Sequence, residues 1–101
     1  MAFDKMKQMY DLQKKAKEIQ KKLAAELITA TAGEGAVEVV MTGEQKLKSI
    51  RLDREKIDPE RLDLLSQQLE EAVRAAMAEA QQVAAEEMKQ ITGDLGIPGM
   101  G

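Results

Sequence analysis

The sequence contains no cysteine, no histidine and no tryptophan, and its only aromatic residues are one phenylalanine and one tyrosine. The lack of cysteine excludes a disulfide framework and thiolate chemistry. The lack of histidine removes the usual general base, the usual zinc ligand and the commonest pH switch. The core of this 101-residue chain must therefore be built from aliphatic side chains and many alanines. Such a core buries little area per residue, so we expect a second copy of the chain to add burial.

Long apolar segments and phosphate-binding loops are absent as well. No apolar run approaches the ~18 residues that a membrane span needs, and the first residues show no apolar signal-peptide core. Gly33-Glu34-Gly35 predicts a turn and not a dinucleotide site, because no helix pattern follows it. We therefore expect a soluble cytoplasmic protein that is not an enzyme. We also expect no cofactor, no metal site, no small-molecule substrate and no membrane partner.

The sequence does contain a near-repeat of three seven-residue blocks: DKMKQMY (4–10), DLQKKAK (11–17) and EIQKKLA (18–24). The register aligns acidic residues in one column and lysines in another, and it leaves an apolar seam at heptad spacing. The acidic column holds Asp4, Asp11 and Glu18, the lysine column holds Lys7, Lys14 and Lys21, and the seam holds Met9, Leu12, Ala16, Ile19 and Leu23. This pattern predicts a helix over residues 3–25, with the lysine column facing outward and the seam facing another helix or a partner subunit.

Charge is distributed unevenly along the chain, although the net charge is only −3. Residues 1–25 sum to +4, residues 26–57 to −1 and residues 58–92 to −5. A stripe of lysines along a helix can contact the phosphates of a nucleic acid backbone. Acidic residues three or four positions before the lysines equally fit a solvated helix that is stabilised by local ion pairs. The pattern alone leaves both interpretations open.

The lysine-rich face of this first helix is the candidate binding site. Its main candidate residues are Lys7, Lys14, Lys15, Lys21 and Lys22. A second basic group follows in the middle of the chain and would extend the site if it lies near the first helix. This group consists of Lys46, Lys48 and Arg51.

The middle of the chain changes to short β-branched segments separated by glycine-containing turns. Residues 27–32, 36–42 and 46–53 have the composition and alternation of strands. Their short links, at Gly33 and Gly43, predict an antiparallel three-stranded meander.

A second long helix is predicted to follow the strands. Asp58-Pro59-Glu60 offers an N-cap, a proline at the first position and an acid in the first turn. We expect the helix to end near Thr92, with Gly93 as its stop. Alanines on its apolar face allow close approach of a neighbouring element, and the face comprises Leu62, Leu65, Leu69, Ala72, Val73, Ala76, Met77, Ala80, Val83, Ala84, Met88 and Ile91. Residues 1–92 then form one domain, and the Gly/Pro/Met segment 93–101 is expected to be a flexible tail.

These segments together predict an α+β fold of order α-βββ-α, in which two long helices flank a three-stranded antiparallel sheet. A sheet of three strands has two faces and two edges, which is more than one small chain covers. We therefore expect a homodimer in which sheets or helix bases pack together.

This arrangement of residues resembles the YbaB/EbfC family of bacterial nucleoid-associated proteins along nearly the whole chain. The resemblance rests on the opening helix MKQMYDLQKKAKEIQKKL, on Gly35-x-Val37-x-Val39-x-x-x-Gly43 and on Leu47-x-x-Ile50-x-Leu52-Asp53. It continues through the Leu62, Leu65 and Leu69 face, the segment EEAVRAAMAEA and the Gly/Pro/Met tail.

The resemblance implies a small homodimeric DNA-binding protein of the bacterial cytoplasm, associated with the nucleoid. It also implies a tweezers-like dimer, in which helical arms project from a central sheet core. The family has no sharp binding motif to transfer, so the assignment of individual lysines is our own. The acidic second helix would oppose DNA binding except near Arg61, Arg74 or Lys89.

We therefore hypothesise that the chain binds duplex DNA mainly through phosphate contacts, with a role in nucleoid organisation and gene regulation. Two other classes of function remain at this stage. The first is a prefoldin-like helical chaperone that holds clients on the apolar seam and the methionines. The second is an adaptor that binds only protein, through the acidic second helix.

Overall fold

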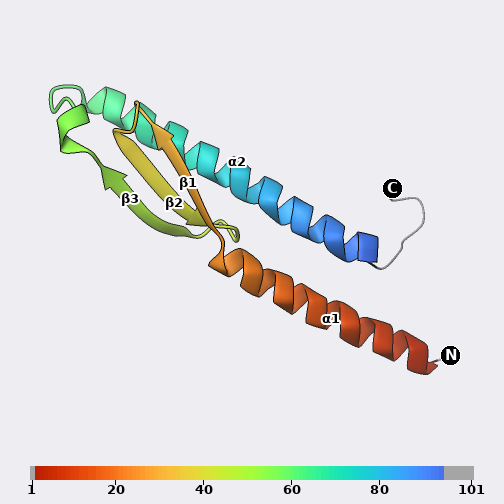
Figure 1. Cartoon of the computed structure of the whole chain (residues 1–101). Coiled ribbons are helices and arrows are strands. Elements are labelled where there is room, and N and C mark those ends of the chain that lie inside the picture. The colour runs from red at the N-terminus through yellow and green to blue at the C-terminus, as the bar shows by residue number, and fades with distance from the viewer. Residues whose placement is uncertain (1, 95–101) are drawn as a thin grey trace.

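A computed structural model describes residues 2–94 of the chain, with side chains described from Lys5 to Gln90. The element order is α1 (Ala2–Ala25), β1 (Leu27–Ala32), β2 (Val37–Thr42), β3 (Leu47–Leu52), a short 3-10 helix η1 (Arg54–Lys56) and α2 (Leu62–Asp94), as Figure 1 shows. The predicted α-βββ-α order is confirmed, and each strand begins and ends within one residue of its predicted limits.

The predicted start of the second helix is wrong by three residues: α2 begins at Leu62 and not at Pro59, because Asp58 and Pro59 belong to a separate turn. The Asp58 carboxylate accepts a hydrogen bond from the backbone N–H of Glu60 at 2.9 Å. The Asp58 carbonyl accepts one from the N–H of Arg61, also at 2.9 Å. A short polar side chain that bonds its own backbone in this way competes with the helix. At its other end α2 continues through Gly93 to Asp94, and residues 95–101 of the predicted tail lie outside the described residues.

The three strands form an antiparallel sheet of order β1-β2-β3. Ala30 of β1 pairs with Val39 of β2, which pairs with Ile50 of β3. Directly paired residues point to the same face of a sheet, so these three side chains lie on one face. The register shifts beyond Val40, where Lys48 is left as the extra residue of a bulge.

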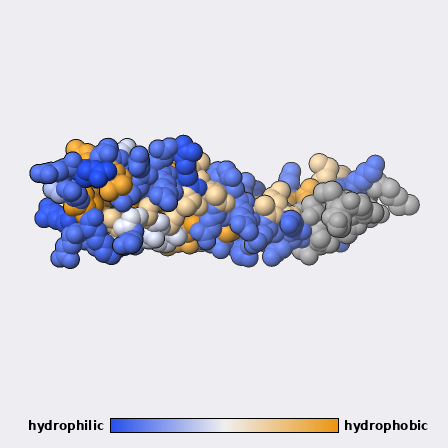
Figure 2. Space-filling model, turned by 90° about the horizontal axis from the view of Figure 1, so that it is seen from above, coloured by the Kyte–Doolittle hydropathy of each residue, from blue (hydrophilic) through white to orange (hydrophobic). Residues whose placement is uncertain are grey.

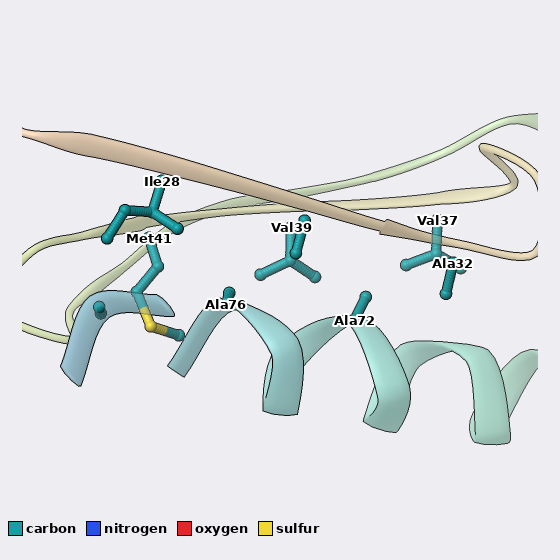
Figure 3. Packing of buried hydrophobic residues seen from close by; sticks show 9 residues of the cluster. Ile28, Ala32, Val37, Val39, Met41, Ala72 and Ala76 are labelled. Carbon is teal, nitrogen blue, oxygen red and sulfur yellow. The ribbon is translucent and has the colours of Figure 1, made fainter. Parts of the chain in front are cut away.

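The hydrophobic core lies between α2 and one face of β1 and β2. Figure 3 shows Ala72 and Ala76 of α2 pointing at Val37, Val39 and Ile28 of the sheet. The alanines let the helix backbone approach the strands closely, as predicted from the sequence. The residues of this core cluster are all apolar and none is aromatic: Ile28, Ala30, Ala32, Val37, Val39, Met41, Ala72, Ala76 and Ala80.

The third strand is left uncovered by α2, and all six of its side chains are exposed. Leu47, Ile50 and Leu52 are 53%, 44% and 49% exposed. Their pairing partners, Met41, Val39 and Val37, are core residues. We call Leu47, Ile50 and Leu52 the apolar half-face, because they continue the core face of the sheet beyond the helix. Figure 2 shows hydrophobic side chains gathered at the end of the molecule that holds the sheet.

Among the described residues, the side chains of the first helix are buried against the body near its C-terminal end. Leu23 is buried there, and its carbonyl accepts a hydrogen bond from the N–H of Gly43 at 2.9 Å. All side chains from Lys5 to Lys14 are exposed, and the radius of gyration is 19.3 Å. A compact domain of this size would have about 13 Å. We call residues 2–21 of α1 the arm, and Figure 1 shows it running beside the last turns of α2.

Gly43 fixes how closely the end of α1 approaches the sheet. A Cβ at this position would lie 2.9 Å from the carbonyl oxygen of Leu23 and 3.0 Å from its side chain. We expect Gly43→Ala to lower the free energy of unfolding by about 1–3 kcal/mol, as overpacking does. Urea unfolding would measure this loss.

The matched control is Ala24→Gly, on the exposed side of the same helix end. Gly35→Ala would not serve as a control, because Gly35 has a positive φ and an alanine there would add backbone strain. Equal losses in both variants would contradict a specific clash at Gly43.

Candidate nucleic-acid interface

The first helix carries seven of the fifteen basic residues of the chain and is net positive. Its 24 residues include seven lysines and three acidic residues. Lys7, Lys14 and Lys21 are all exposed and follow one another at heptad spacing. At 1.5 Å per residue, this lysine column extends over about 21 Å of the arm. Lys22 is exposed beside it and Lys15 is half-buried.

The predicted seam of α1 is covered only where the helix meets the body. Leu23 is buried and Ile19 is half-buried, whereas Leu12 and Met9 are exposed. The C-terminal part of the seam therefore contacts α2, whereas no described residue covers the N-terminal part of the seam. The lysine column is not on this seam, so the two predicted faces of the helix are distinct.

Lys22 differs from the other candidate lysines because it binds across to the second helix. Its Nζ lies 2.8 Å from Oε1 of Glu87. This hydrogen bond, with the Coulombic attraction of the same pair, raises the pKa of the Lys22 ammonium. Ion pairing within α1 would instead join Lys22 to Glu18, which lies four residues earlier on the same helix. Lys22 thus joins α1 to α2.

The second basic group is divided between two ends of the sheet. We call the end of α1 at Lys22 and Leu23 the root of the arm. Lys46 lies near this root, because its carbonyl accepts a hydrogen bond from the N–H of Thr42, and the adjacent Gly43 is hydrogen-bonded to Leu23. Arg51 lies five residues further along the chain, about 17 Å away along an extended strand. It pairs in register with Glu38 and borders a shallow basin with Asp53 and Arg54. The structure therefore brings Lys46 near the lysine-rich helix but not Arg51.

The second helix presents mainly negative charge. It contains seven acidic residues against two basic ones, Arg74 and Lys89. Arg74 binds the Glu70 carboxylate, and Arg61, just before the helix, binds Asp63 at 3.2 Å. The Arg61 hydrogen bond lowers the pKa of the Asp63 carboxyl. Arg61 and Arg74 are thus already paired with carboxylates, which leaves α1 as the best candidate for phosphate binding.

Glu87 is a residue that the sequence pattern did not single out. It is buried, with 8% of its surface exposed, on the face of α2 that carries Ala76, Ala80 and Val83. A carboxylate at a position that continues an apolar stripe is the sequence signal that was available.

Sites for other chemistry are not evident in the described part of the chain. No three acidic, histidine or cysteine side chains from the described residues converge to hold a metal ion. Neither α1 nor α2, over the residues described, is long and apolar enough to cross a membrane.

Comparison with known proteins gives matches over nearly the whole chain. The chain is 39% identical over 98 residues to a nucleoid-associated protein of Syntrophobacter fumaroxidans, covering 97% of this chain and 89% of that protein. It is 38% identical over 95 residues to one of Myxococcus xanthus, covering 94% and 90%. The crystal structure of an uncharacterized protein from Helicobacter pylori shares the fold with a TM-score of 0.68 at 19% identity, covering 94% of this chain and 97% of that one. Residues 2–95 match the family profile described as the YbaB/EbfC DNA-binding family, and the chain belongs to that family.

Proposed function

We propose that this protein is a nucleoid-associated DNA-binding protein of the bacterial cytoplasm, and that it binds duplex DNA as a homodimer through phosphate contacts. Membership of the YbaB/EbfC DNA-binding family supports DNA as the ligand. The names of its relatives, which are nucleoid-associated proteins, support a place in the nucleoid. A role in nucleoid organisation and gene regulation is part of the same proposal. The observation that carries the binding mode is the exposed lysine column of α1.

The column favours backbone contacts over base readout. Lysine is a flexible point charge that suits phosphate, whereas base recognition relies more on the bidentate groups of arginine, asparagine and glutamine. The lysine column contains none of these residues; the arm has no arginine or asparagine, and its three glutamines, Gln8, Gln13 and Gln20, lie outside the column. Affinity should then depend steeply on salt concentration and little on sequence, because counterion release supplies most of the free energy.

The apolar half-face supports the homodimer. It exposes three large aliphatic side chains on a strand whose outer edge has no partner in the described chain. An open edge next to an apolar surface is a typical site of pairing with another copy. A two-fold dimer would present two arms to one duplex and double the number of phosphate contacts.

The family match also bears on the two rival functions. It supports DNA binding over the prefoldin-like chaperone and the protein-only adaptor. The three-stranded sheet likewise exceeds the single hairpin that a prefoldin-like arm would need.

The test is a titration of a short duplex at several salt concentrations. The variant Lys7→Gln/Lys14→Gln/Lys21→Gln is expected to bind more weakly, with a salt slope lower by about 0.9 for each phosphate that the variant no longer neutralises. Circular dichroism would show that the exposed substitutions leave the fold intact.

The matched comparison changes the same number of charges elsewhere. Lys46→Gln/Lys48→Gln/Arg51→Gln removes three positive charges from the second basic group, of which Lys46 lies near the arm and Arg51 does not. We expect a smaller change in slope for this variant. Equal slopes for the two variants would show that net charge, and not the lysine column, governs binding. Wild-type protein that fails to bind at low salt would refute the proposed function.

A further inference from the structure

The ion pair between Lys22 and Glu87 lies where the arm leaves the body. The sheet-facing core of α2 ends with Ala80 and the half-buried Val83, and Glu87 follows one turn later. Glu87 is one of the two buried polar or charged residues among those described, and only 11% of its side chain is exposed. A buried carboxylate is costly without a partner, so removing Lys22 would leave a strongly unfavourable group.

The pair also determines which way the lysine column faces. Successive residues of an α-helix are rotated by about 100°. If Lys22 is held toward α2, then the adjacent Lys21 points about 100° away from it, and Lys14 and Lys7 follow Lys21. A rotation of α1 about its axis would turn the whole column.

The arm acts as a lever on any change at its root. Lys7 lies 15 residues before Lys22, or about 22 Å along the helix axis. A tilt of roughly 10° at Lys22 would therefore displace Lys7 by about 4 Å, more than a hydrogen-bond length. Contacts at the root thus control contacts near the tip.

We infer that Glu87 is a positioning residue for DNA binding, which holds Lys22 and thereby sets the spacing of the arm from α2 and the direction of the lysine column. This inference rests on the proposed function, and it gives Lys22 a different role from the other candidate lysines. Lys22 anchors the arm, while Lys7, Lys14 and Lys21 contact phosphates.

The decisive comparison is between two neighbouring carboxylates. Glu86→Lys and Glu87→Lys make the same change of charge on adjacent residues of α2, but Glu86 is exposed and Glu87 is buried. Long-range electrostatics alone predicts stronger DNA binding for both variants. If Glu87 positions the arm, Glu86→Lys should bind DNA more tightly and Glu87→Lys should bind it several-fold more weakly, because the new lysine at position 87 would repel Lys22.

Arm spacing can be measured independently of DNA. The chain has no cysteine, so spin labels at Gln13→Cys and Gln90→Cys would be unique, and both positions are exposed. Double electron–electron resonance on labelled chains diluted with unlabelled protein reports the distance within one chain. We expect Glu87→Lys to lengthen and broaden this distance, and Glu86→Lys to leave it unchanged. Glu87→Gln, which preserves shape, covers the case in which the lysine variant fails to fold and should broaden the distance in the same way.

A charge swap separates the anchor from a phosphate contact. Lys22→Glu/Glu87→Lys rebuilds the pair in reverse and keeps the net charge of the chain. We expect it to restore both the distance and the affinity for DNA. Restored distance with weakened DNA binding would overturn the role of Lys22, and an unchanged distance in Glu87→Lys or Glu87→Gln would overturn that of Glu87. Lack of DNA binding by the wild type would instead refute the proposed function, while the distances would still test the anchor.

Discussion

Replacing Ile50 by lysine is expected to convert the proposed dimer into monomers. Ile50 lies at the centre of the apolar half-face and pairs with the core residue Val39. In a dimer that covers this surface, the new ammonium would be buried without a partner, at a cost of several kcal/mol per ion. Since each 1.4 kcal/mol is about tenfold in affinity, the dissociation constant should rise by more than about a hundredfold. Analytical ultracentrifugation over a range of chain concentrations would measure it.

The matched control is Ser49→Lys, one position earlier on the same strand. Ser49 pairs with Val40, so it points to the opposite face of the sheet. Both variants add one charge to an exposed position of β3. They differ in the face that receives the charge and in the side chain that is replaced. We expect Ser49→Lys to remain dimeric. If Ser49→Lys dissociates and Ile50→Lys does not, then the copies meet through the outer face of the sheet.

Loss of the dimer should also weaken DNA binding, although no proposed phosphate contact is altered. A monomer presents one arm, so it neutralises about half as many phosphates as a dimer with two. The salt slope should therefore fall to about half of the wild-type value. This effect distinguishes Ile50→Lys from substitutions in the lysine column, which change the slope while the protein stays dimeric.

Local patterns were sufficient to predict most of the fold. β-branched segments and glycine turns specified the strands to within one residue, because each strand is short and is bounded by residues with strong turn preferences. The alanine-rich face of α2 was predicted from the helical periodicity of its apolar residues, and its alanines pack against the sheet in the structure. The start of α2 was missed because the Asp58 side chain can cap a turn as well as a helix.

Features that depend on contacts between distant segments could not be predicted. The alternation of β3 gives its two faces but not the fact that α2 leaves one of them open, because that depends on where the helix crosses the sheet. The heptads likewise placed Lys22 beside the lysine column but gave no sign of Glu87, 65 positions away. The lysine column could be predicted because it is a property of one helix, whereas its orientation depends on two.

Truncating Ile28 to alanine is expected to give the largest loss of stability among single core substitutions on β1. Ile28 is 4% exposed and packs between the sheet and α2, as Figure 3 shows. Removing its buried methylene and methyl groups should cost about 2–5 kcal/mol, through lost burial and the cavity left behind. For a domain of this size each kcal/mol corresponds to roughly 4–8 °C in Tm. Urea or thermal unfolding at a fixed chain concentration would measure the change, since stability of a dimer depends on concentration.

Leu27→Ala is the matched control, because it removes a similar side chain one residue earlier on the same strand. Leu27 points to the opposite face of the sheet and is 61% exposed. Its truncation should change the free energy of unfolding by no more than about 0.5 kcal/mol. A loss as large as that of Ile28→Ala would mean that the outer face of the sheet is also buried in solution. The second copy would then cover the outer face at β1, so the stability pair and the Ile50 pair test by independent measurements which face of the sheet is covered.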